Sequence, residues 1–312
     1  MIKPLTGSDL LVAKIPERKS WMPPLICSGC LGMIFARPGI GKSYFCLWLA
    51  AALGGGMNFL KWVNYDMARV LYVDGEMGLR ELQSRYRELD RAQRSECAKL
   101  HTTFLCPESF PGLVTPAIND PVGQRFYFGL MQQQDVLFLD NYSCLVRRGK
   151  SDTDEQLWSS IQPWLTQLRA MGKCVILVHH AGKSGDQLGT STKEFALDWC
   201  LKFFVPADYE DDNGARFNVQ FTKGRMKGEE KEAFTAWYKS VNGRTEWVWQ
   251  GAKESRRGQM QKMKAIGMAD RDIAQALGMS LFAVKKVLRD LEVEAMPQPP
   301  QWCEEERCDD LF

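Results

Sequence analysis

Short apolar runs alternate with amphipathic stretches along the first two thirds of this 312-residue chain. The apolar runs are nearly continuous, which is typical of strands buried on both faces. The runs expected to be strands are LGMIFA (31–36), RVLYVD (69–74), HTTFLC (101–106), DVLFLD (135–140) and CVILVH (174–179). Helical periodicity covers residues 42–53, 78–90, 120–133 and 153–171. This alternation predicts an α/β fold, with helices on both sides of a parallel sheet.

The pattern changes after Leu201, where turn sequences separate apolar and aromatic runs. The runs LKFFV, RFNVQFT, AFTAWYK and TEWVWQ predict antiparallel strands at one edge of the sheet. A polar stretch then forms a linker, and helical periodicity returns beyond it. We expect an N-terminal extension (1–30), an α/β core (31–250), a linker (251–258), a helical module (259–294) and a tail (295–312).

Composition narrows the class of protein. A chain that is 45% hydrophobic and this long can bury one large core and a small satellite module. It has no apolar run of about 18 residues and no signal-peptide pattern at its N-terminus. Its ten cysteines are scattered, which favours a reducing compartment over a disulfide framework. We therefore expect a soluble cytoplasmic protein.

Charge is unevenly distributed along the chain, although the net charge is only +2. Residues 255–290 carry eight cations against three anions. The last thirteen residues carry five acids and one Arg. The basic module suggests a nucleic-acid partner, whereas the acidic tail cancels its charge in the sum.

The segment FARPGIGKS, between an expected strand and an expected helix, is typical of a phosphate-binding loop. We expect Lys42 to reach the β- and γ-phosphates of ATP and Ser43 to bind Mg²⁺. Ala36 replaces the usual first glycine, which is tolerable if its φ stays negative. The expected nucleotide-binding residues are Ala36, Arg37, Pro38, Gly39, Ile40, Gly41, Lys42, Ser43 and Tyr44. The weaker alternative is a glycine-rich turn with no ligand.

Acidic residues follow two of the expected strands. Asp140 ends DVLFLD, where a carboxylate can hold Mg²⁺ through water. Glu76, in RVLYVDGEM, is our candidate to polarise the water that attacks the γ-phosphate. Asp74 competes for this role, and either acid could instead cap the next helix.

Two adjacent histidines, His179 and His180, end the strand in VILVHHAGKSG. A neutral imidazole there can hydrogen-bond the γ-phosphate and sense its loss. We favour His179 over His180 for this sensor role, against the alternative that both are structural.

The ordered set ARPGIGKS, YVDGEM, VLFLDN, LVHHAGKSG and FTKGRMKG resembles the RecA-type ATPases over about residues 20–240. More narrowly, it resembles the ring-forming replicative helicases of plasmids typified by RepA, and related ATPases of prophages. The resemblance implies a RecA-like core, a hexamer with ATP at each interface, and 5′ to 3′ movement. It also implies that Lys223 and Arg225 reach into the neighbouring subunit's site as an arginine finger does. The alternative for this pair is a solvated cationic turn.

Two loops near the expected γ-phosphate carry cations. Arg147, Arg148 and Lys150 lie in CLVRRGKSDTD, and Lys183 lies in AGKSGDQLGTST. In RecA-like rings the corresponding loops line the central channel and grip single-stranded DNA. Ordinary solvated loops are the alternative.

The segment ADRDIAQALGMSLFAVKKVLRDL has the spacing of a helix-turn-helix. The expected packing sets Ile273, Ala274 and Leu277 against Val284, Val287 and Leu288. Lys285, Lys286 and Arg289 would then meet duplex DNA. A helical hairpin that packs on the core is the alternative.

Two further features carry weaker hypotheses. The acidic tail ends in Leu311 and Phe312, which suits docking to a replication protein, although such tails are more often solvated. Cys27 and Cys30 form a C-x-x-C pair, and a zinc site with Cys303 and Cys308 is conceivable but weakly supported.

Together these features favour a ring-forming, ATP- and Mg²⁺-dependent motor on single-stranded DNA, namely a replicative helicase of a plasmid or prophage. The alternative is a DNA-binding ATPase that regulates replication, transposition or transcription without unwinding. A clock-type signalling ATPase is disfavoured, because such chains usually carry duplicated cores and this one has a single phosphate loop.

Overall fold

The computed structural model describes residues 4–15, 17–107, 116–181, 196–206, 209, 215–224, 232–241, 244–251, 259–261 and 263–295. The chain divides into two compact units, residues 1–250 and 251–312, and each is described by itself. None of the helices in these ranges is long and apolar enough to cross a membrane.

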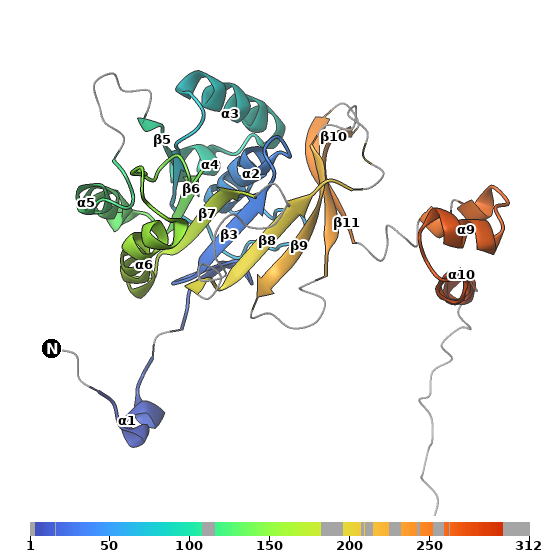
Figure 1. Cartoon of the computed structure of the whole chain (residues 1–312), viewed down its shortest axis with the longest axis horizontal. Helices are drawn as coiled ribbons and strands as arrows, with labels where there is room; N and C mark the ends of the chain where they lie inside the picture. The colour runs from blue at the N-terminus through green and yellow to red at the C-terminus, as the bar shows by residue number, and fades with distance from the viewer. Residues whose placement is uncertain are drawn as a thin grey trace, which may run out of the picture. The chain divides into compact units, whose positions relative to one another are not determined.

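A large, mostly parallel sheet forms the centre of the first unit (Figure 1), which confirms the α/β prediction. Nine strands of the described residues follow the order β11-β10-β9-β8-β3-β7-β6-β4-β5. The parallel strands are β3 (Leu31–Ala36), β4 (Val70–Asp74), β5 (Thr102–Leu105), β6 (Val136–Asp140), β7 (Cys174–His180) and β8 (Trp199–Phe204). At one edge follow β9 (Arg216–Gly224), β10 (Phe234–Val241) and β11 (Arg244–Gly251). β9 is antiparallel to both β8 and β10.

Helices cover both faces of the sheet because successive side chains on each strand point to opposite sides. The helices are α2 (Lys42–Gly55), α3 (Leu79–Gln93), α4 (Glu96–His101), α5 (Pro121–Leu130, continued by the 3₁₀ turn Met131–Gln133) and α6 (Asp154–Ala170). Side chains of α2, α3 and α4 pack with Ile34, Phe138 and Ile176 on one face. Those of α5 and α6 pack with Met33 and Leu137 on the other face.

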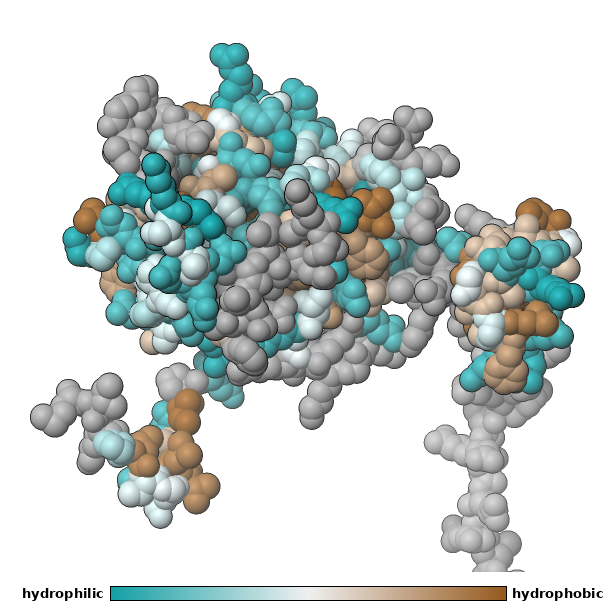
Figure 2. Space-filling view, in the orientation of Figure 1, coloured by the Kyte–Doolittle hydropathy of each residue, from teal (hydrophilic) through white to brown (hydrophobic). Residues whose placement is uncertain are grey.

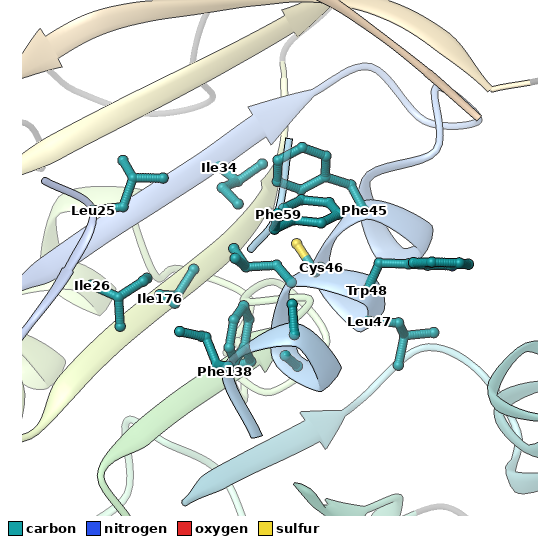
Figure 3. Close-up of a cluster of buried hydrophobic side chains, with 14 of the residues drawn as sticks. Leu25, Ile26, Ile34, Phe45, Cys46, Leu47, Trp48, Phe59, Phe138 and Ile176 are labelled. Atoms are coloured by element: carbon teal, nitrogen blue, oxygen red, sulfur yellow. The ribbon is translucent and has the colours of Figure 1, made fainter. Parts of the chain in front are cut away.

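Helix α2 is apolar around most of its circumference and is buried along most of its length. Phe45 lies edge-on to the rings of Phe59 and Phe203, and Cys46 belongs to the same cluster (Figure 3). A helix enclosed in this way is fixed in position. The loop that precedes α2 therefore starts from a rigid base.

The packed core begins before residue 31, which differs from the predicted boundary of the extension. Strands β1 (Ser20–Met22) and β2 (Ile26–Cys27) form a separate two-stranded sheet, and Trp21 and Leu25 are buried in the main core. These residues are apolar enough to bury, although their short runs carry no clear periodicity. By contrast, helix α1 (Gly7–Val12) exposes its apolar side chains (Figure 2).

In the second unit, α9 (Asp270–Ala276) and α10 (Leu281–Ala295) enclose a small apolar core. Ile273 and Ala274 of α9 are buried in it with Val284 and Leu288 of α10. The turn between the helices contains Gly278 at φ +59°, a backbone region that favours glycine. The helix pairing expected from the sequence is present, and a DNA-binding role for it stays a prediction.

Candidate nucleotide-binding site

The phosphate loop connects β3 to α2 and turns on two glycines. Gly39 and Gly41 have φ of +81° and +104°, where a side chain is disfavoured. A Cβ on Gly41 would also lie 3.1 Å from that of Ala215. Ala36 is still part of β3 and pairs with His180 of β7. Among the described residues only Leu60 and Arg94 are non-glycines with positive φ, so Ala36 meets the condition under which it can replace glycine.

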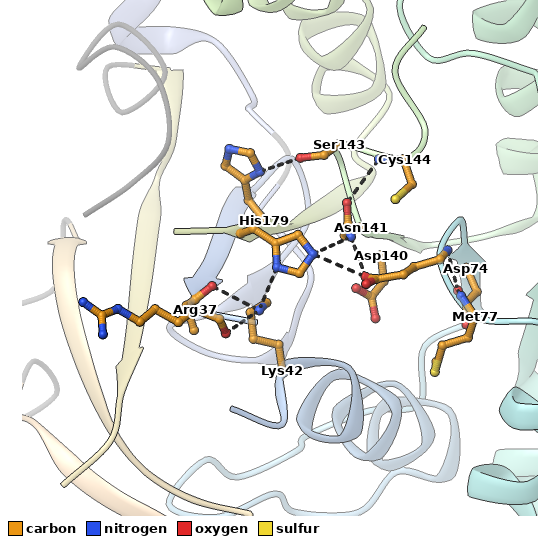
Figure 4. A network of polar contacts seen from close by, with 12 residues as sticks. Arg37, Lys42, Asp74, Met77, Asp140, Asn141, Ser143, Cys144 and His179 are labelled. Atoms are coloured by element: carbon orange, nitrogen blue, oxygen red, sulfur yellow. Dashed lines mark hydrogen bonds and ion pairs between the residues drawn. The ribbon is translucent and has the colours of Figure 1, made fainter. Parts of the chain in front are cut away.

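Lys42 is the first residue of α2, and its ammonium group is directed back into the loop (Figure 4). Its Nζ donates to the carbonyl oxygens of Ala36 at 3.1 Å and Arg37 at 3.0 Å. It also lies 3.3 Å from Nδ1 of His180. Burial lowers the pKa of Lys42, and the nearby Asp140 and Glu76 carboxylates oppose that shift. The site thus holds a partly desolvated cation where a phosphate would lie.

Asp140 ends β6 beside Ser43, so the two predicted Mg²⁺ residues are neighbours. The hydroxyl of Tyr72 donates to Oδ2 of Asp140 at 2.5 Å, and Ser43 also hydrogen-bonds this carboxylate. The other oxygen, Oδ1, is buried without a hydrogen-bond partner among the described residues. Burial raises the pKa of Asp140. An unpaired buried oxygen is costly, which makes it a ready acceptor for a metal-bound water.

The two acids after β4 take different positions. Asp74 is buried, and its Oδ1 accepts hydrogen bonds from the backbone N–H groups of Glu76 and Met77, at 3.0 and 2.8 Å. Burial raises the pKa of Asp74 to about 6. Glu76 instead lines the cavity with its carboxylate half exposed. Asp74 therefore shapes the turn that presents Glu76.

The histidine at the phosphate loop is His180, not His179, which corrects the placement we expected. Adjacent residues on a strand point to opposite faces, and β7 pairs His180 with Ala36. His180 Nε2 lies 2.8 Å from Asn141 Nδ2 and 3.4 Å from Glu76 Oε2. His179 is buried on the other face, where Nδ1 lies 3.2 Å from the Ser143 hydroxyl.

Asn141 joins these groups, and the sequence analysis did not assign it a role. Its Nδ2 donates to Glu76 Oε2 at 2.5 Å, and its Oδ1 accepts from the backbone N–H of Cys144 at 3.1 Å. The signal was its place directly after Asp140 in VLFLDN. Lys42, His180, Asn141 and Glu76 thus form one chain of polar contacts.

A cavity of about 680 Å³ opens over this network. Its volume is in the range of small-molecule sites. The phosphate loop, Glu76 and His180 line one part, and Val205, Tyr209 and Arg216 line another. Tyr44 and Arg85 also reach it, with the Arg85 guanidinium 5.2 Å from the centre of the Tyr44 ring. The cavity can accommodate a ligand that extends beyond its phosphates.

The family model for the AAA domain matches residues 2–186. The chain belongs to the AAA domain family. Within the family it has a RecA-like P-loop ATPase fold. A search of curated proteins returned no match.

Solved structures resemble this AAA domain at low sequence identity. A KaiC-like protein, PH0186, from Pyrococcus horikoshii OT3 is 14% identical, with a TM-score of 0.50 over 74% of this chain and 93% of its own. The flagellar accessory protein FlaH from Methanocaldococcus jannaschii is 14% identical, with a TM-score of 0.47 over 71% and 90%. The ATPase domain of a helicase is 13% identical, with a TM-score of 0.49 over 71% and 85%. The first of these likenesses supports the fold.

Lys223 lies away from the phosphate loop of its own AAA domain. It pairs with Cys200 of β8, and Cys200 pairs with Met33 in the middle of β3. β9 then continues to Gly224, level with Gly32, toward the edge of the sheet opposite to the loop. Arg225 lies outside the described residues. A strand that runs in this direction carries the Lys-x-Arg segment away from Lys42.

The cations expected to bind DNA lie in three places. Arg147 and Arg148, after β6, are exposed and form ion pairs with Asp120 and Asp154, the first at 3.7 Å. Lys150 is exposed in the same loop. Lys285, Lys286 and Arg289 are exposed on α10. Lys183 lies outside the described residues.

Proposed function

We propose that this AAA domain protein is an ATP-hydrolysing motor on single-stranded DNA, and that it acts as a ring-forming replicative helicase of a plasmid or prophage. The observation that carries the proposal is the contact chain Lys42–His180–Asn141–Glu76 beside the unpaired buried oxygen of Asp140. It joins a phosphate-binding cation, a metal-binding acid and a general base at one edge of the sheet.

The residues at this edge fit Mg²⁺–ATP. The loop N–H groups and the start of α2 favour the phosphates, and Lys42 would exchange its bonds to the loop carbonyls for phosphate oxygens. Ser43 and Asp140 would hold Mg²⁺, with Asp140 accepting from a metal-bound water through Oδ1. The metal would neutralise the charge that develops on the leaving phosphate. The cavity beyond the loop leaves room for the nucleoside.

Glu76 is the proposed general base. Its exposed carboxylate would take a proton from the attacking water, while Asn141 fixes its orientation through the 2.5 Å hydrogen bond. His180 touches both Lys42 and Asn141, so loss of the γ-phosphate would change contacts at both of its ring nitrogens. The sensor role therefore passes from His179 to His180.

Oligomerisation would complete the site. The Lys223–Arg225 segment runs away from its own phosphate loop, so any contribution it makes to a γ-phosphate comes from a neighbouring subunit. A heterologous interface of this kind closes into a ring. Cations lent across it would stabilise the transition state only when two subunits meet.

Movement on DNA would follow from the loop after β6. Asn141 starts this loop, which leads to Arg147, Arg148 and Lys150 within a few residues. Their surface ion pairs are worth about 0–1 kcal/mol, so DNA phosphates can displace them. A shift of Asn141 on hydrolysis would thus reach the strand. The resemblance to RepA-like rings gives the same loop a place in the channel.

A second candidate function is a DNA-binding regulatory ATPase without unwinding. The exposed cations on α10 favour it, because they lie on one helix of a separate compact unit. In the motor, the same unit would recruit the ring to an origin or a duplex flank.

ATP hydrolysis by the full chain, with and without single-stranded DNA, tests the motor together with displacement of a labelled strand. We expect DNA-stimulated hydrolysis and unwinding, both lost in Lys42→Ala. Hydrolysis without unwinding, together with binding to a defined duplex, would favour the regulator instead. Absence of ATP hydrolysis under every condition would contradict both functions. Electron microscopy with an ATP analogue and DNA would show whether the strand passes through a ring.

A further inference from the structure

Three thiols gather at the amino-terminal edge of the sheet, at the opposite end of β3 from the phosphate loop. Cys27 ends β2 and Cys30 immediately precedes β3. The backbone N–H of Cys30 donates to the carbonyl of Cys27 at 3.0 Å, and the two side chains are hydrogen-bonded to each other. Cys174, at the start of β7, accepts a hydrogen bond from the backbone of Cys27. The C-x-x-C spacing thus brings two sulfur atoms into contact.

The two contacting thiols differ in access to solvent. Cys27 is partly exposed, whereas Cys30 is buried. The hydroxyl of Ser20 also donates to Cys27 Sγ, at 3.5 Å. The hydrogen bond from Cys30 is the main cause that lowers the pKa of Cys27 to about 6, and the same bond raises the pKa of Cys30. The accessible sulfur is therefore the better nucleophile at neutral pH.

The turn that carries the pair is held by its neighbours. Gly29 has φ of +71°, and its carbonyl accepts from Arg169 Nε at 3.0 Å. Ser28 N–H donates to the carbonyl of Lys19 at 2.7 Å. These bonds fix the backbone on both sides of the thiols. The sulfur atoms stay together without help from a ligand.

We propose that Cys27 and Cys30 form a redox-active dithiol, which a hydroperoxide converts reversibly to an intramolecular disulfide. The pair is a modification site outside the nucleotide-binding site. Cys174 is fully buried and lies beyond the reach of an oxidant.

The reaction balances in two steps. The Cys27 thiolate attacks the peroxide, so that an S–O bond forms, the O–O bond breaks, and the leaving oxygen takes up a proton as water or alcohol. The Cys30 thiol then loses its proton and its sulfur attacks Cys27 Sγ. The S–S bond forms, the S–O bond breaks, and a second water leaves. Two thiols are oxidised by two electrons, and the peroxide is reduced by two. A small-molecule thiol would reverse the step by attacking the more accessible Cys27 sulfur.

Peptide mass spectrometry of the full chain tests the proposal without any substitution. Hydrogen peroxide is added, free thiols are alkylated, and the tryptic peptide between Lys19 and Lys42 is analysed. We expect this peptide to lose the mass of two hydrogen atoms and to regain them with dithiothreitol. Without peroxide, Cys27 should be alkylated about tenfold faster than the exposed Cys97.

Two variants separate the attacking thiol from its partner. In Cys30→Ser, the sulfenic acid on Cys27 persists and is captured by dimedone. In the matched control Cys97→Ser, the Cys27–Cys30 disulfide forms as in the natural chain. The proposal fails if both thiols of the wild-type pair remain alkylatable at peroxide concentrations that oxidise Cys97. Exclusive formation of a disulfide with any other cysteine would also overturn it.

Discussion

Asp140 and Asp198 are buried carboxylates at opposite edges of the same sheet, and their surroundings differ. Asp198 accepts a hydrogen bond from the backbone N–H of Leu31 at 2.9 Å and forms an ion pair with Arg169 at 3.1 Å. Asp140 is paired on Oδ2 only, and its Oδ1 has no hydrogen-bond partner in the part of the chain that the structure describes. A satisfied buried acid stabilises a fold, whereas one with an unpaired oxygen costs free energy that a ligand can offset. The difference separates a structural edge from a chemical edge.

The largest effect is expected at the chemical edge. Glu76→Gln removes the proposed general base but keeps a side chain that can hydrogen-bond Asn141. We expect ATP turnover to fall by about 10³-fold, while nucleotide binding is retained. Steady-state phosphate release and titration with a fluorescent ATP analogue measure the two quantities. Glu81→Gln, on the exposed surface of α3, is the matched control. Turnover near the wild-type rate in Glu76→Gln would assign the base to another residue.

The two carboxylates should respond in opposite ways to removal of their charge. Asp198→Ala leaves Arg169 without its partner and should lower the free energy of unfolding by about 3 kcal/mol. Asp140→Asn removes a charge whose pKa burial has raised, so this variant should be at least as stable as wild type yet hydrolyse no ATP. Urea unfolding followed by circular dichroism measures both, with Asp66→Ala of an exposed ion pair as control. Equal destabilisation by both substitutions would abolish the distinction between the edges.

Stability should also depend on pH through Asp74. Its pKa is about 6 in the folded protein, above the ordinary value of 3.8, so the native state binds more protons than the unfolded state between these values. The free energy of unfolding should therefore decrease as pH rises from 4 to 6, by roughly 2–3 kcal/mol from this group. Asp74→Asn, which keeps an oxygen for the N–H groups of Glu76 and Met77, should lack this decrease. Identical slopes in the two proteins would refute the assignment.

A smaller effect distinguishes the adjacent histidines on the two faces of β7. His180→Ala should lower ATP turnover by about tenfold, because it removes the contact between Lys42 and Asn141. His179→Ala should leave turnover per folded molecule close to wild type, since its ring lies on the face that carries Ser143. Initial hydrolysis rates, scaled to the folded fraction, provide the comparison. The reverse order would restore His179 to the sensor role.

The sequence predicts what local strings determine. Gly39, Gly41 and Lys42 form a contiguous motif between a strand and a helix, and Asp140 ends a fully apolar run. The choice between His179 and His180 was wrong because it depends on which face of β7 turns toward α2. That property comes from the pairing of Ala36 with His180, which links strands far apart in the chain.

Tertiary contacts also explain the other features that the sequence left open. Asn141 gains its importance only when Glu76 and His180 lie on either side of it. Trp21 and Leu25 sit in short segments with no clear period, yet both are buried against the main core. The contact between the Cys27 and Cys30 thiols likewise depends on the turn that Arg169 holds. Such contacts have no signature in a single stretch of residues.

Complementation between two inactive variants tests the central claim most directly. Glu76→Gln lacks the base, and Arg225→Ala lacks the cation proposed to act across the interface. In a mixed ring, Glu76 of an Arg225→Ala subunit can face Arg225 of a Glu76→Gln subunit, and that site is complete. We predict that an equimolar mixture recovers about a quarter of wild-type ATP hydrolysis, the share of complete interfaces in random assembly. A mixture no more active than its separate components would contradict a site shared between subunits.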